Sequence, residues 1–363
     1  MHIGKSNSAF GKRLRKNKGA IFGLILICLA LLLAMFGYLL APDGSPNANR
    51  MITEIGSKKP GFSMSFLTVK REQPLKPTNF FEQLINGKEE AYQYIPITYV
   101  ETIGDSSIYQ KYVDDGVDER KAILSSSLHH NNKTANTQLT FYLGTDKFGR
   151  DILSRLIIGV RVSLGVGLIA VIISLTIGIL LGSIAGYFRG WADDLIMWFI
   201  NVIWSIPTLL LVFAITLLLG KGFWQVFIAV GLTMWVNVAR LVRGQVLAVR
   251  ELEYVEATRA LGYSHSRTIF RHILPNILGP VMVIAASNFA SAIVIEAGLS
   301  FLGVGVQPPQ PSWGLMIKEN YNFIITHNPM LALAPGIAIM LLVLAFNLLG
   351  NGLRDALNVR GKI

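Results

Sequence analysis

The chain has 363 residues but only one cysteine, Cys28. A single thiol excludes an intrachain disulfide and a metal cluster held by several cysteines. Cys28 lies within a long apolar segment, where we expect it to be an ordinary small core residue.

Charged residues are also scarce, because Asp, Glu, Lys and Arg make up 15% of the chain and hydrophobic residues 52%. A soluble fold of this length would be less apolar. The formal net charge of +11 would also suit a nucleic-acid-binding protein. The basic residues, however, lie at the edges of apolar segments, which indicates membrane orientation and contact with the lipid bilayer, with no nucleic acid as a partner.

Several catalytic and binding motifs are missing. The phosphate-binding pattern Gly-x-x-x-x-Gly-Lys-Ser/Thr is absent, because Gly4-Lys5-Ser6 lacks the upstream glycine. The polar segment 42–142 contains neither Gly-x-Ser-x-Gly nor His-Glu-x-x-His. Its adjacent His129-His130 have no spaced partners and are expected to be solvent-exposed. We therefore predict that the chain is not an enzyme and has no catalytic, cofactor or metal site, so that any ATP binds to another protein.

Long apolar segments are abundant. A helix needs about 20 apolar residues to cross the ~30 Å hydrocarbon core of a bilayer, where it satisfies its own backbone groups. Six segments free of Asp, Glu, Lys and Arg meet this need: 20–41, 162–188, 195–220, 222–239, 273–295 and 329–353. The first is too long for a signal peptide. We therefore predict an all-α polytopic membrane protein with six transmembrane helices.

The distribution of Lys and Arg predicts the orientation. These residues gather in the first 19 residues, in 240–271 and after residue 353, whereas the short loops of the other side contain only Lys221 and Lys318. The positive-inside rule then makes both termini cytoplasmic. The strand-like stretches 62–69 and 92–100 fall in the segment between the first two helices. We predict a mixed α/β insertion there, on the external side, with an Asn-rich loop at 129–137.

The predicted order of parts follows from these boundaries. It is a basic cytoplasmic tail (1–19), the first transmembrane helix (20–41), the external insertion (42–142), a membrane core (143–353) and a cytoplasmic tail (354–363). The core contains helices two to six and a cytoplasmic connection at 244–275.

That connection reads as a helix, a break and a second helix. Val255, Thr258 and Leu261 recur at three-residue spacing on one side, and Gly262 is suited to the left-handed conformation that ends a helix. Ser264 is expected to cap the second helix. A short, half-apolar helix pair suits docking into a partner protein and equally suits a position on the lipid surface, so these properties leave both interpretations open.

The same stretch resembles the coupling loop of ABC importer permeases. The family pattern is Glu-Ala-Ala, three residues, Gly, nine residues and Ile-x-Leu-Pro. This chain has Glu256-Ala257-Thr258, then Gly262, then His272-Ile273-Leu274-Pro275. Thr258 replaces the second Ala, and His272 replaces Ile. In that family the loop sits in a cleft of the ATPase subunit. The resemblance thus implies that the coupling positions are Glu256, Ala257, Gly262, Leu274 and Pro275.

Two further stretches are similar to the dipeptide and oligopeptide branch of the same family, which also includes nickel transporters. In Gly-Thr-Asp146-Lys-Phe-Gly-Arg150-Asp151, we favour a structural turn over substrate contact, with an aspartate capping a helix and pairing with Arg150 or Arg155. The second stretch, 299–314, is rich in Gly and Pro and ends near Trp313, which suits a membrane interface.

The resemblance implies a permease subunit for peptides or similar small solutes in the bacterial inner membrane. It also implies several partners: a second homologous permease, two ATP-hydrolysing subunits and an extracytoplasmic solute-binding protein.

Glu296 is the one carboxylate within an extended apolar region, so it is a candidate pathway or gating group. Its position near the outer end of a helix equally allows it to be solvated or paired. The alternative function is an ion-coupled secondary transporter, which would need several buried carboxylates or broken helices. Glu296 is the only candidate for such a carboxylate in the sequence.

Overall fold

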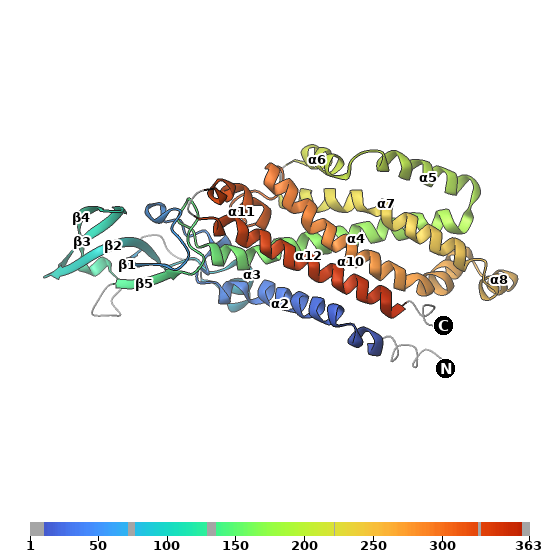
Figure 1. Ribbon diagram of the computed structural model, residues 1–363, viewed down its shortest axis with the longest axis horizontal. Helices are drawn as coiled ribbons and strands as arrows, with labels where there is room; N and C mark the ends of the chain where they lie inside the picture. Colours follow the sequence, from blue (N-terminus) through green and yellow to red (C-terminus); the bar gives the residue numbers. More distant parts are fainter. Residues whose placement is uncertain (1–10, 72–76, 129–135, 221, 326–327, 358–363) are drawn as a thin grey trace. The chain divides into compact units, whose positions relative to one another are not determined.

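The computed structural model describes residues 11–71, 77–128, 136–220, 222–325 and 328–357. The chain divides into two compact units. The first unit contains the described residues up to 30, together with 163–307 and those from 339 onward, and the second contains 31–162 and 308–338. Figure 1 labels the strands and most of the helices of both units.

In the described part of the chain, five helical stretches are long and apolar enough to cross a membrane. They are α2 (Lys18–Leu40), α4 (Ile152–Phe188), α7 (Phe223–Val249), the continuous stretch His265–Leu302 and α12 (Met330–Leu357). The stretch His265–Leu302 consists of α9 (His265–Thr268), a π-helical turn (Ile269–Ile273) and α10 (Leu274–Leu302). Five of the six predicted segments therefore correspond to these spans.

The segment 195–220 differs from the prediction of one straight crossing. It contains most of α5 (Gly190–Trp204) and all of α6 (Thr208–Leu219), which are bent by 91°. Pro207 explains the break, because proline lacks an N–H donor and disfavours helical geometry in the residue before it. The structure thus has five spans, or six if the bent pair counts as one.

Within the first unit, α4 and α7 pack closely through glycines of α4. A Cβ atom at Gly182 would lie 2.5 Å from the carbonyl oxygen of Ala239, and one at Gly178 would lie 2.4 Å from Cβ of Val238. Small residues allow this approach of two helix backbones. Cys28, in contrast, is exposed on α2, so the expectation that it is a core residue was wrong.

The second unit contains a five-stranded antiparallel sheet with the strand order β4-β3-β2-β1-β5. Its strands are β1 (Phe62–Lys70), β2 (Tyr92–Ile103), β3 (Ser106–Asp114), β4 (Val117–Leu124) and β5 (Asn136–Phe141). The short helix α3 (Phe80–Asn86) lies between β1 and β2 in the chain. The predicted strands at 62–69 and 92–100 and the mixed α/β character of the insertion are therefore confirmed.

The predicted Asn-rich loop was too long at its end, because Asn136 and Thr137 pair with β1 in strand β5. The rest of that loop, including His129 and His130, lies outside the described residues.

Candidate functional site

The loop between α7 and α10 contains the short helix α8 (Glu253–Ala260). The turn at Gly262 ends this helix, as the sequence predicts. Gly262 has φ +73°, and its N–H donates to the carbonyl of Arg259 at 2.9 Å. The N–H of Tyr263 donates to the carbonyl of Thr258 at 3.0 Å. This pair of bonds satisfies carbonyls at the helix end and requires the left-handed conformation that glycine adopts easily. Ser264 caps α9 by accepting a bond from the N–H of Arg267.

One side of the loop is buried against the first unit. Val255 is fully buried in a cluster that includes Val242 and Val246 of α7 and Ile273 of the π-helical turn. Thr258 is also buried. Leu261 is 70% exposed, so the prediction that it shares one side with Val255 and Thr258 was wrong. It follows the last residue of α8, where helical spacing no longer applies.

The positions implied by the resemblance lie on or near the other side. Glu256, Ala257, Gly262 and Pro275 are exposed, and Leu274 is half-buried. Large apolar side chains surround them, with Tyr254, Leu261 and Phe270 exposed by 42%, 70% and 63%. Figure 1 shows α8 at the end of this unit, where α7 stops and α10 begins. The loop thus presents a mixed apolar and charged surface that is available to a partner.

The loop is also attached to the end of α4. The hydroxyl of Tyr187 lies 3.1 Å from Nδ1 of His265, and Arg250 donates to the backbone carbonyl of Tyr187. Arg189 pairs with Glu251, whose carboxylate is also 3.3 Å from Nε of Arg250. Burial and the neighbouring guanidinium groups lower the pKa of Arg250 below its usual value. The loop is therefore held to the end of α4 as well as to α7 and α10.

A cavity of about 690 Å³ lies within the same unit, lined by residues of α5 to α7, α10 and α12. Its polar lining consists of uncharged side chains from four helices: Thr208, Thr233, Asn237, Ser287, Asn288, Ser291 and Asn347. Sequence reasoning missed these residues, although an amide within an apolar helix is a signal for a functional position. Such a lining can form hydrogen bonds with a polar solute without holding it by charge.

Glu296 is fully buried in α10 but is not among the residues that line this cavity. Its Oε1 accepts a hydrogen bond of 2.6 Å from the hydroxyl of Ser300. The same hydroxyl accepts a bond of 3.1 Å from the N–H of Val306. These contacts connect Glu296 to the turn that follows α10, and its role as a pathway or gating group stays a prediction.

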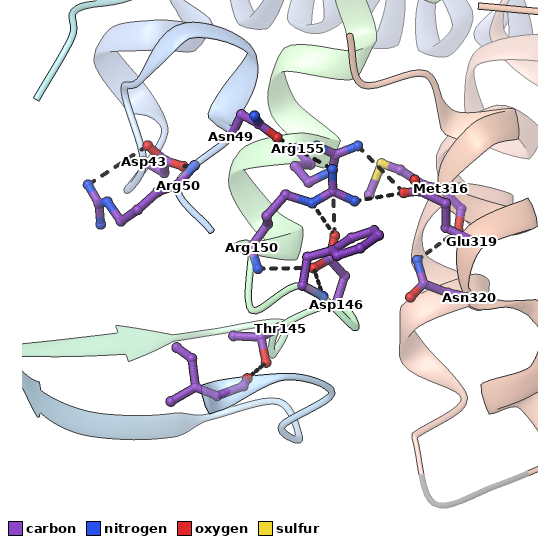
Figure 2. Close-up of polar contacts among 12 residues, drawn as sticks. Asp43, Asn49, Arg50, Thr145, Asp146, Arg150, Arg155, Met316, Glu319 and Asn320 are labelled. Carbon is purple, nitrogen blue, oxygen red and sulfur yellow. Dashed lines mark hydrogen bonds and ion pairs between the residues drawn. The ribbon is translucent and has the colours of Figure 1, made fainter. Parts of the chain in front are cut away.

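A buried ion-pair cluster occupies the second unit (Figure 2). Nε of Arg150 donates to Asp146 at 2.6 Å, and Nη2 of Arg150 donates to Glu319 at 2.8 Å. The fully buried Arg155 lies 3.9 Å from Asp146 and 3.8 Å from Glu319. Glu319 belongs to α11 (Trp313–Asn320), so the cluster joins α11 to the start of α4. Two cations face two carboxylates, which keeps the buried charges balanced.

The neighbouring turn has the structural role that the sequence predicts. Asp151 accepts a bond of 2.8 Å from the N–H of Ser154 in the first turn of α4. Burial raises the pKa of Asp151, and its bonds from Ser154 oppose that rise. Trp313 is 3% exposed, and its indole N–H donates to the carbonyl of Leu156 at 3.0 Å. Trp313 thus packs inside the protein, and its place at a membrane interface stays a prediction. Among the described residues, no group of three or more side chains is arranged to hold a metal ion.

Two family descriptions match the sequence. "Binding-protein-dependent transport system inner membrane component" matches residues 178–362, which include the loop and all of the cavity-lining residues. "N-terminal TM domain of oligopeptide transport permease C" matches residues 9–56. The chain belongs to this family of ABC importer permeases. The permease is a transport component and not an enzyme, and the family assignment disfavours the secondary-transporter alternative despite the broken helix pair.

Three similar proteins support the assignment. A glutathione transport system permease protein from Pectobacterium atrosepticum is 42% identical over 221 residues, which cover 61% of this chain and 73% of that protein. A dipeptide transport system permease protein from Alkalihalophilus pseudofirmus is 42% identical over 64% of this chain and 76% of that protein. An oligopeptide transport system permease protein from Bacillus subtilis is 40% identical over 60% of this chain and 71% of that protein.

Among solved structures, an inward-facing MetNI methionine ABC transporter has a TM-score of 0.47 and 18% identity. The match covers 56% of the permease and 97% of that chain, a similarity too low to add to the assignment. Permeases of this family work with ATPase and solute-binding partners. The sheet of the permease lies between the two matched ranges and outside both.

Proposed function

We propose that this permease moves peptides or similar small solutes across the bacterial inner membrane, driven by ATP that separate subunits hydrolyse. The names of its relatives support this substrate class, since they describe dipeptide, oligopeptide and glutathione transport. In the proposed topology, α5 and α6 together form one of six crossings, both termini and the loop 244–275 are cytoplasmic, and the insertion 42–142 is periplasmic. The concentration of Lys and Arg in 240–271 supports this orientation.

The two sides of the loop carry the proposal. Its exposed side offers Glu256, Ala257 and Gly262 to an ATPase subunit, while its buried side continues into the core through Val255 and Ile273. A docked ATPase that changes shape therefore moves a body already packed against α7 and joined to α10. Close-packed interiors transmit such displacements because they have little room to deform. Leu274 and Pro275 transmit the motion directly, since they begin α10.

The cavity supplies the proposed pathway. Its neutral amides and hydroxyls, such as Asn237, Asn288 and Asn347, match the donors and acceptors of a peptide backbone. The absence of a charged side chain from its described lining suits passage of solutes that differ in charge. Weak, neutral contacts also favour release, because a transport site must not hold its solute tightly.

The proposed assembly contains this chain, a second homologous permease, two ATP-hydrolysing subunits and an extracytoplasmic solute-binding protein. Conformational coupling in this assembly follows from differential binding: the ATPases bind ATP in one arrangement of the loops and release its products in another.

Reconstitution into proteoliposomes tests the proposal. The complete assembly should import a peptide only under two conditions. ATP must be present on the side of the membrane where the ATPase subunits lie, and binding protein loaded with peptide must be present on the opposite side. Uptake driven by a proton or sodium gradient, by this chain alone and without ATP, would overturn the proposal. Glu256→Lys in the same assembly should abolish uptake while the protein still inserts into the membrane, because it reverses a charge on the proposed docking surface.

A further inference from the structure

A second hollow, of about 430 Å³, lies beside the coupling loop and is separate from the proposed pathway. We call it the lateral groove. One wall is the last third of α4, with Ile179, Leu180 and Ile184, and the other is the π-helical turn, with Ile269 and Phe270. The lateral groove is lined mostly by apolar side chains, and its α4 wall belongs to a helix with the composition of a membrane span. In the proposed topology that wall faces lipid.

The lateral groove has polar groups at three places. One is Thr176, whose hydroxyl donates to the carbonyl of Ile172. His265 and Ser266 line it at the start of α9. Ser183 also lines it, is only 4% exposed, and has a hydroxyl with no hydrogen-bond partner among the residues that the structure describes. A buried hydroxyl without a partner is unfavourable, and a ligand with an acceptor oxygen would relieve that cost.

Positive charge gathers next to His265. Tyr187, which bonds to His265, has the guanidinium carbon of Arg259 5.2 Å from its ring centre and that of Arg250 at 6.0 Å. Arg189 and Arg250 flank one carboxylate, Glu251, and Arg259 lies close enough to Arg250 to act on its charge. We call these three arginines the arginine cluster. The cluster keeps excess positive charge beside the polar end of an apolar groove.

We propose that the lateral groove binds an anionic phospholipid, with one acyl chain between α4 and the π-helical turn and the phosphate beside the arginine cluster. The two parts of such a lipid match the two parts of the site. Apolar surface accepts the chain, and basic pockets between membrane helices on the cytoplasmic side attract anionic headgroups. The ester and phosphate oxygens are acceptors for the hydroxyl of Ser183 and for the arginines.

The effect of lipid binding on transport rests on the proposed function, whereas the binding itself does not. A lipid in the lateral groove lies between α4 and the coupling loop, so it stabilises the arrangement of α4, α9 and α10 in which the groove is open. The anionic lipid content of the membrane would then set how much ATP hydrolysis the transporter converts into transport.

Photolabelling of the complete complex, without nucleotide, tests the binding. The probe is phosphatidylglycerol with a diazirine near the end of one acyl chain, and labelled peptides are mapped by mass spectrometry. We expect label concentrated in 176–188 and 265–274, and removed by phosphatidylglycerol more effectively than by phosphatidylcholine. Arg259→Gln should lower this preference about fivefold, the contribution of one arginine near an anionic lipid surface.

Two matched variants locate the site. Leu180 and Ile172 are both on α4 and are exposed by 54% and 55%, but only Leu180 lines the lateral groove. Leu180→Trp should abolish the label, and Ile172→Trp should leave it unchanged; Ile184→Trp gives a second test of groove filling.

Label spread evenly along α4, equal competition by the two lipids, or capture of an ATPase side chain in the groove would overturn the proposal. The readout needs no transport. Specific labelling in a complex that fails to import peptides would therefore contradict the proposed function alone.

Discussion

The hydroxyl of Tyr187, one residue before the end of α4, lies 3.1 Å from Nδ1 of His265, the first residue of α9. These residues are 78 positions apart in the chain, and their contact connects a membrane helix directly to the coupling loop. The rings of Tyr187 and His265 also meet edge to face, with centres 5.5 Å apart. The end of α4 thus has a direct part in the proposed coupling.

Tyr187→Phe should weaken coupling without unfolding the protein. The substitution removes one hydrogen bond, a loss of about 1 kcal/mol, and keeps the ring contacts. We expect less peptide imported for each ATP hydrolysed, measured in proteoliposomes that contain the full assembly. His265→Ala should have the same effect. Unchanged stoichiometry of transport in both variants would show that this contact takes no part in coupling.

Gly262→Val should abolish uptake. The φ of +73° at Gly262 is unfavourable for any residue with a Cβ atom, by roughly 1–2 kcal/mol, and a β-branched side chain is worse. The turn after α8 would therefore change direction and move Leu261 and Tyr263. Gly244→Val is the control, because Gly244 lies in α7 with open space around it and no positive φ. Equal transport by the two variants would contradict a role for this turn.

Arg150→Met should destabilise the second unit. It leaves the buried Asp146 and the half-buried Glu319 with only Arg155, which has no hydrogen bond among the described residues, as the remaining cation of the cluster. Breaking a buried pair costs about 3–5 kcal/mol. The expected result is a lower Tm in detergent. Adding Glu319→Gln should restore part of the loss, since it removes the excess negative charge. A double variant no more stable than the single one would show that charge balance does not explain this cluster.

Asn288→Leu and Asn347→Leu should slow peptide uptake while ATP hydrolysis still responds to loaded binding protein. Each change removes donors and acceptors from the proposed pathway but leaves the coupling loop intact. Asn351→Leu is a matched control, because Asn351 is exposed on the same helix as Asn347 and does not line the cavity. If Asn351→Leu slowed uptake as much as Asn347→Leu, the cavity would not be the pathway.

The sequence predicts the parts of this protein whose signal is local. Apolar length locates the spans, and Gly262 and Ser264 have the conformations that their residue types favour. The same local pattern misplaced Leu261, because helical spacing cannot show where α8 ends. It also missed the bend in 195–220, since an apolar segment with a proline is compatible with both a kinked span and a broken one.

Long-range partners were outside the reach of sequence reasoning. The pairing of Asp146 with Arg150 is predictable because the two residues are four positions apart in the chain. Glu319, in contrast, lies 169 residues from Arg150. The cavity has the same difficulty, because Asn237, Asn288 and Asn347 come from three helices and only the fold brings them together. Each is polar within an apolar segment, which was the available signal. Nothing local indicated that they line one space.

Cross-linking of the coupling loop to the ATPase tests the central claim most directly. Replacing the single native cysteine by Cys28→Ala allows one new thiol to be placed at Leu261, which is 70% exposed beside Gly262. In membranes that contain the full assembly, Leu261→Cys should be joined by a short bismaleimide to a cysteine in the cleft of an ATPase subunit, with a yield that changes when ATP is added. Tyr99→Cys, on the sheet and 56% exposed, should give no such product. Cross-linking from Tyr99→Cys and none from Leu261→Cys would contradict both the docking surface and the orientation of the chain.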